Sequence, residues 1–451
     1  MSKFVKDKRF YRTFLTLTFA IALQNLIVFS VNLADGIMVG AYSETALSGV
    51  AIVNQIQFLL QMIVTGFAEG MIVLTSQYWG KKQIEPIKKI FSCVLFLGIL
   101  SSFVLTIVVF FFPHSVLGLL TNDKAVVAQG VKYIKIICFT YCIFAITNIA
   151  IGVLRSVQTV KIGFYVNIST LIVDIILNYL LIYGKFGFPE LGVEGAAIAT
   201  LIARIIECVI VLSYLLFLDK KLQLKLSSLF SLHLSYLKDF LRSGFPIVLS
   251  KTSWGIAMSV QIAILGRLGG SAIAASSIAT TIFQVVTVIA YGSSNASGIL
   301  IGKTVGEGKI KEVKEYSKTL QLLFLGIGVV TSAVLFGLKD FIVSVYRVSP
   351  ETHALAEWFI LILCVTVIGT AYQMPCLTGI VAGGGDTKFV FYNDIIFMWL
   401  IVLPLSISCA FVFHLPSIVV FACLKSDQIL KCAVAVVKVN RFRWIRVLTR
   451  A

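Results

Sequence analysis

Residues 32–40 read NLADGIMVG and residues 258–266 read MSVQIAILG, and both stretches end in three apolar residues and a glycine. They lie 226 residues apart, and this spacing persists well beyond them. Other residues repeated at a spacing of 226 or 227 are Gly66 and Gly292, Gly80 and Gly306, Gly152 and Gly379, and Lys161 and Lys388. A spacing that holds over more than a hundred positions predicts an internal duplication.

The composition places both copies in a membrane. The 451 residues are 58% hydrophobic and 13% charged, with a mean hydropathy of +0.97, whereas soluble domains carry about 25% charged residues. A helix needs about 20 apolar residues to cross a bilayer. We therefore predict an all-α integral membrane protein with twelve transmembrane helices, near 11–35, 46–76, 90–112, 131–153, 164–184, 193–218, 240–265, 272–300, 319–338, 354–379, 389–411 and 415–437.

The basic residues predict the orientation. The net charge is +17, but the Lys and Arg residues gather in alternate connections, such as 81–89, 220–242 and 303–318. Cytoplasmic loops collect such residues, so we expect a multi-pass protein of the cytoplasmic membrane with both termini in the cytoplasm, and no nucleic-acid partner. The basic N-terminus is followed by no small-residue cleavage site, so we interpret the first apolar segment as a retained span.

The duplication predicts two pseudo-symmetric lobes of six helices each. Because six is even, the copies share one orientation, with a midplane cavity between them. The predicted boundaries are 1–218 for the first lobe, 219–239 for an interfacial linker, and 240–451 for the second lobe with a short basic tail.

No sequence pattern indicates an enzyme or a bound cofactor. The nine cysteines show no CxxC spacing and the four histidines are isolated, so we expect no metal site of Cys or His. The Gly-rich VAGGGDTK, residues 381–388, lacks the spacing of a phosphate loop, and we interpret it as a tight turn.

Acidic residues in apolar spans are the candidate functional residues. A charge at bilayer depth costs roughly 2.5–3.5 kcal/mol on insertion scales. Asp35 closes the first span, Asp174 and Asn178 share one face of the fifth, and Thr200 opens the sixth. Such oxygens suit a hard cation such as Na⁺, and a desolvated carboxyl can instead carry a proton. The alternative is that Asp174 and Asn178 bind neighbouring helices, with Asp35 at the headgroups.

Other charged residues in the spans have weaker claims. Glu69, Lys251 and Asp394 are predicted either to line the cavity or to lie near a helix partner or a span end. Arg204 and Glu207 lie three residues apart, and we predict that they neutralise each other.

The chain contains, in this order, the motifs NLADGIMVG (32–40), ALSGVAI (46–52), SQYWGKK (76–82), GFPIVLSKTSWG (244–255), AIAASSIATTI (272–282), VAGGGDTK (381–388) and WIRVLT (444–449). Together these motifs resemble those of the multidrug and toxic compound extrusion (MATE) transporters over essentially the whole chain. The resemblance implies two six-helix lobes in a V-shaped bundle, and efflux of organic cations in exchange for sodium or protons by rocker-switch alternating access.

A cation site found in part of this family matches Asp35 and Thr200. On the fifth span the family reads Asn-x-x-Leu-Asp, whereas this chain reads Asp174-Ile-Ile-Leu-Asn178, so the carboxylate has moved by one helical turn. The resemblance therefore assigns coupling to Asp35, Asp174, Asn178 and Thr200, and leaves Na⁺ and H⁺ both open. Lys251 stands where many relatives carry Glu, and its charge would repel a cation.

The leading hypothesis is a monomeric secondary antiporter that exports organic cations in exchange for Na⁺ or H⁺. The alternative is a lipid-linked saccharide flippase of the same superfamily, which Lys251 and Arg204 favour. A non-transporting sensor or membrane enzyme fits less well, because the sequence shows neither a soluble output domain nor a catalytic constellation.

Overall fold

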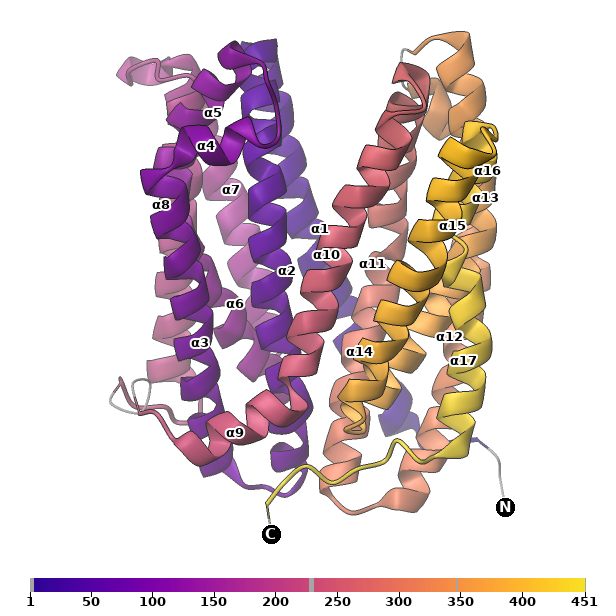
Figure 1. Cartoon of the computed structure of the whole chain (residues 1–451). Helices are drawn as coiled ribbons and strands as arrows, with labels where there is room; N and C mark the ends of the chain where they lie inside the picture. The colour runs from indigo at the N-terminus through magenta and orange to yellow at the C-terminus, as the bar shows by residue number, and fades with distance from the viewer. Residues whose placement is uncertain (1–3, 227–230, 346–347, 451) are drawn as a thin grey trace. The chain divides into compact units, whose positions relative to one another are not determined.

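The computed structural model describes residues 4–226, 231–345 and 348–450, and it is helical without strands over these residues (Figure 1). Residues 227–230 of the predicted linker lie outside the described residues, as do the first three residues and the last one. The predicted all-α fold is confirmed.

One compact unit comprises residues 23–75 and 83–248. Its core contains buried Val53, Ile134 and Tyr141. Its helices are the second part of α1 (Lys8–Tyr42), most of α2 (Glu44–Gly80), α3 (Ile84–Phe111), α4 (Pro113–Gly118), α5 (Lys124–Ile137), α6 (Thr140–Ser156), α7 (Lys161–Tyr183), the 3₁₀ turn η1 (Lys185–Gly187), α8 (Val193–Ser213) with its π-helical end η2 (Tyr214–Leu218), and α9 (Leu234–Ser243).

The other compact unit comprises residues 1–22, 76–82 and 249–451. In its core the rings of Phe359 and Phe421 stack at a centroid distance of 4.0 Å. It contains the first part of α1, most of α10 (Phe245–Gly266), α11 (Gly270–Gly306), α12 (Ile310–Val345), α13 (Pro350–Met374) with η4 (Pro375–Val381), α14 (Thr387–Ile395) with η5 (Ile396–Val402), α15 (Leu403–Ile407) with η6 (Ser408–Val412), α16 (Ser417–Leu424) and α17 (Asp427–Arg441).

The number of long apolar helices is close to the prediction. Among the described residues, ten helices are long and apolar enough to cross a membrane, and the pair α5 and α6, bent by 53°, would make eleven. The predicted twelfth span, 415–437, forms the two shorter helices α16 and α17. It carries Lys425, Asp427 and Lys431, which explains its weaker apolar character. This is roughly consistent with twelve spans.

The hairpin of α7 and α8 positions the polar residues considered below. Gly184 ends α7 with a left-handed φ of 61°, which glycine adopts at little cost. A Cβ on Gly195 would lie 2.5 Å from the carbonyl oxygen of Leu181. Only glycine allows this backbone contact, so Gly195 sets the close approach of the start of α8 to the end of α7.

The Gly-rich segment 381–388 forms a turn that receives the basic tail, which confirms the turn interpretation. The Arg446 N–H donates to Gly384 O at 2.7 Å. The Asp386 carboxylate lies 2.8 Å from Lys438 Nζ and 3.3 Å from Arg446 Nη2. A Cβ on Gly384 would meet the fully buried Trp444 ring at 2.1 Å, so the glycine makes room for the indole.

Candidate functional site

Asp35 of α1 and Asp174 of α7 are joined by one amide. Asn178 Nδ2 donates to Asp35 Oδ1 at 2.6 Å and to Asp174 Oδ2 at 3.0 Å. Asp174 and Asn178 are fully buried and Asp35 is half-buried. The two carboxyl groups also lie close enough to interact directly. We call Asp35, Asp174, Asn178 and Thr200 the first-unit cluster.

Thr200 and Tyr133 border the two carboxyl groups. Thr200 lies beside Asp174 and donates its own hydroxyl to Ala196 O at 3.1 Å. The buried Tyr133 of α5 lies beside Thr200 and within the field of both aspartates. The structure thus brings all four predicted residues together, and adds a tyrosine that the sequence analysis did not single out.

Two buried acceptor oxygens of this cluster have no hydrogen-bond partner among the described residues. They are Asp174 Oδ1 and Asn178 Oδ1. A buried acceptor without a donor costs free energy, on the order of 1–3 kcal/mol. Oxygens of this kind fit a hard cation, which carboxylate and amide groups bind directly, and the carboxyl oxygen equally fits a proton.

Arg204 and Glu207 of α8 form the predicted ion pair, with Nη1 and Oε2 2.7 Å apart. Both side chains are largely buried, with 15% and 5% exposed, and the guanidinium also lies over the Phe144 ring. Its charge acts on Asp35 and Asp174 as well. Because Glu207 offsets Arg204, the net charge of the region is set by the two aspartates, which ionised would leave it at −2.

The three weaker candidates have separate surroundings. Glu69 of α2 acts electrostatically on Arg155 of α6, which donates to Gln24 Oε1. Lys251 of α10 places its Nζ 5.7 Å from the centroid of the Tyr291 ring. The structure therefore does not bring Glu69 or Lys251 into the first-unit cluster.

Asp394 belongs to a second polar cluster, in the unit that contains residues 249–451. Its carboxylate accepts a hydrogen bond from Ser250 Oγ and lies 2.9 Å from Lys431 Nζ of α17. The same ammonium lies 3.6 Å from Asp427 Oδ2. The Lys431 and Asp427 side chains are 5% and 2% exposed. We call Asp394, Asp427 and Lys431 the second-unit cluster.

Three residues of these surroundings were not predicted from the sequence, namely Tyr133, Asp427 and Lys431. Tyr133 lies in a span rich in Lys and aromatic residues, so nothing marks it out. Asp427 and Lys431 do carry a signal, since a carboxylate and an ammonium four residues apart lie on one helix face. Among the described residues, no group of three or more His, Cys, Asp or Glu side chains could hold a metal ion.

The described residues form an all-helical protein with many long apolar helices and with ionisable groups buried among them, an arrangement typical of membrane transporters. A family model described as MatE matches residues 20–180 and 246–408, most of the chain. The chain therefore belongs to the MatE family, whose members are transporters and not enzymes. The two matched segments begin 226 residues apart, which agrees with the internal repeat.

Known proteins are similar to this chain over nearly its full length. The chain is 27% identical over 406 residues to a probable multidrug resistance protein NorM of Bacillus cereus, covering 87% of each chain. It is 26% identical over 404 residues to an uncharacterized transporter, YisQ, of Bacillus subtilis, covering 89% of this chain and 87% of that one. Its fold matches a crystal structure of a mutant of the Vibrio cholerae MATE transporter VcmN, with TM-score 0.87, 17% identity and 98% of both chains covered.

Proposed function

We propose that this transporter is a secondary antiporter that exports small organic cations across the cytoplasmic membrane in exchange for Na⁺ or H⁺. The observation that carries the proposal is the pair of carboxylates, Asp35 and Asp174, bridged by Asn178 inside an apolar helix bundle. The similarity to proteins described as probable multidrug resistance proteins supports drug-like substrates.

The proposed cluster holds the coupling ion through its own oxygens. Asp35 and Asp174 supply the negative charge, while Asn178 Oδ1 and the Thr200 hydroxyl are neutral oxygens beside them. With the ion absent, the bridging amide holds the two acids, and with the ion or a proton present, their repulsion is reduced. The two occupancies therefore differ in the forces between α1 and α7, which lets ion binding bias alternating access.

The membrane potential and the ion's concentration gradient are the two possible driving forces for the exchange. Each charge that crosses the membrane field is worth about 2.3 kcal/mol per 100 mV. If one monovalent drug cation leaves as one Na⁺ or H⁺ enters, no net charge moves. The ion's concentration gradient then supplies the drive. We further propose two six-helix lobes, cytoplasmic termini, a monomer, and a cavity lined by Glu69, Lys251 and Asp394.

Flux in proteoliposomes tests this function. Purified protein would be reconstituted with a fluorescent organic cation, and Na⁺ and pH gradients would be imposed separately. We expect one gradient to drive uptake in the wild type and neither to do so in Asp35→Asn or Asp174→Asn. Asp340→Asn removes a carboxylate whose side chain is 75% exposed, and should behave as the wild type. Wild-type flux in both cluster variants would overturn the assignment.

A second candidate is a flippase for lipid-linked saccharides, favoured by the half-buried Lys251 of the second unit. Lys431 does not favour it, because its ammonium is already paired with Asp394 and Asp427. Basic groups suit a polyanionic substrate such as a pyrophosphate-linked lipid. The two candidates separate in cells. Drug resistance on expression supports the antiporter, whereas rescue of a cell-wall precursor defect supports the flippase.

A further inference from the structure

The chain forms a compact turn directly after the candidate span Val193–Leu218. The span ends in the π-helical turn η2, where the side chains of Phe217 and Leu218 are 83% and 66% exposed. A polar segment with three lysines, DKKLQLK (219–225), follows at once. Apolar side chains therefore give way to ammonium groups within a few residues, as they do where a membrane meets water.

Hydrogen bonds and buried side chains hold this turn in place. Asp219 Oδ2 accepts the Leu222 N–H at 2.7 Å, and Lys221 Nζ donates to Val157 O at 2.7 Å. Leu222 and Leu224 are buried, with 1% and 4% exposed. Asp219 thus stabilises the turn and Lys221 attaches it to Val157 at the end of α6. The side chains of Lys220 and Lys225 are exposed.

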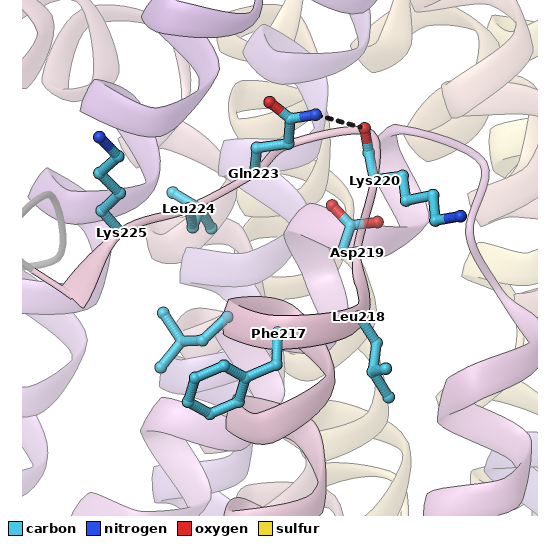
Figure 2. A pocket seen from close by; sticks show the side chains of 8 residues that line it. Phe217, Leu218, Asp219, Lys220, Gln223, Leu224 and Lys225 are labelled. Carbon is cyan, nitrogen blue, oxygen red and sulfur yellow. Dashed lines mark hydrogen bonds between the residues drawn. The ribbon is translucent and has the colours of Figure 1, made fainter.

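A hollow of about 420 Å³ lies within this segment, lined by Leu216, Phe217, Leu218, Asp219, Lys220, Gln223, Leu224 and Lys225. Figure 2 shows Phe217 and Leu218 on the helix side, with the ammonium groups of Lys220 and Lys225 on opposite sides of the loop. The Gln223 amide donates to Lys220 O at 3.5 Å. One wall is apolar, and the polar lining comprises two cations, an amide and the Asp219 carboxylate, which already accepts the Leu222 N–H.

We propose that this hollow binds the phosphate headgroup of an anionic phospholipid in the adjacent leaflet. The exposed side chains of Lys220 and Lys225 turn from the opposite sides of the loop to reach the phosphate, and Phe217 and Leu218 contact the first carbons of the acyl chains. Charge complementarity selects an anionic headgroup over a zwitterionic one, because juxtamembrane lysines are attracted to anionic lipid surfaces. The apolar wall, which a free phosphate would leave in contact with water, selects a lipid over inorganic phosphate.

Native mass spectrometry of the detergent-purified full chain measures this binding directly. The probes are phosphatidylglycerol and phosphatidylcholine with identical acyl chains. We expect the wild type to retain phosphatidylglycerol preferentially, and Lys220→Gln/Lys225→Gln to lose that preference by about tenfold, since each juxtamembrane lysine contributes a few-fold. The control variant Lys311→Gln/Lys318→Gln removes two exposed lysines of α12, and it should keep the wild-type preference for phosphatidylglycerol.

Two further measurements test the apolar wall and distinguish a bound lipid from inorganic phosphate. Phe217→Ser should weaken retention of both lipids, because it removes the apolar wall and leaves the charges. Excess inorganic phosphate should leave bound phosphatidylglycerol in place. Equal retention of the two lipids by the wild type, an unchanged preference in the Lys220/Lys225 variant, or displacement by inorganic phosphate would each overturn the proposal. Lipid binding is read out without transport, so failure here leaves the proposed function untouched.

Discussion

The two polar clusters differ in how their charges are balanced. In the first unit, Asp35 and Asp174 share a neutral amide, and Arg204, whose charge acts on both acids, is already paired with Glu207. In the second unit, Asp394 and Asp427 share the ammonium of Lys431. One cluster carries its own cation, whereas the other has acids that a mobile ion or proton can neutralise. This difference is the reason why we propose ion exchange in the first unit.

The internal repeat sharpens this contrast. Asp35 corresponds to Gln261, which is buried and donates to Met398 Sδ at 3.4 Å. Asp174 corresponds to Ile401 and Asn178 to Leu405. The copies therefore share helices, glycines and lysines, while the ionisable side chains differ at the positions that would hold an ion.

The largest expected effect is on transport, from Asp174→Asn. It removes one of the two charges of the first-unit cluster, so gradient-driven flux should fall to the background of protein-free liposomes. The double variant Asp174→Asn/Asn178→Asp restores two acids and one amide, with the acid moved by one helical turn, and should recover part of the flux. Full flux in Asp174→Asn alone would show that transport does not need the charge at Asp174.

The next effect is on the stability of the second unit, from Lys431→Met. Removing one partner of a buried ion pair typically costs about 3–5 kcal/mol, because the remaining charges stay buried and unpaired. Thermal unfolding in detergent should show a clearly lower unfolding temperature for this variant. Asp394→Asn/Asp427→Asn/Lys431→Met, which removes all three charges, should recover most of it. Unchanged stability in the single variant would mean that Lys431 does not neutralise the two acids.

A smaller effect is expected from Gly195→Ala in the hairpin that carries the first-unit cluster. The added Cβ would lie 2.5 Å from Leu181 O, so α7 and α8 must move apart. Overpacking of this kind costs about 1–3 kcal/mol, and flux should also fall. Gly326→Ala on α12 is the matched control, since its Cβ meets nothing within 4 Å. Equal stability of the two variants would argue against the close contact of α7 and α8.

The smallest expected effect is a loss of stability when a helix cap is removed in either unit. Asp123 caps α5 by accepting the Ala125 N–H at 2.9 Å, and Ser349 caps α13 by accepting the Thr352 N–H at 3.3 Å. Replacing either by Ala should cost about 1 kcal/mol in thermal unfolding, with transport unchanged. Similar losses would support equivalent scaffolds in the two units. Loss of transport in Asp123→Ala alone would show that α5, which carries Tyr133, takes part in coupling.

The sequence by itself determined the helical membrane fold, the repeat and the shared helix face of Asp174 and Asn178. These features depend on apolar length and on spacing along one helix, which are local properties. It also indicated Asp35 and Thr200 as candidates, because they are polar residues in apolar spans. The family resemblance was needed to assign them to one site with Asp174 and Asn178, because no local rule joins residues on different helices.

Only the tertiary structure decided the contacts across helices. It brought Asp35 within hydrogen-bonding distance of Asn178, 143 residues away, and placed Asp394 beside Lys431 instead of leaving its partner undefined. It also divided the chain so that α1 contributes to both units, and turned the predicted twelfth span into α16 and α17. The physical reason is that packing of helix faces selects which buried charges meet, and many pairings satisfy the same apolar pattern.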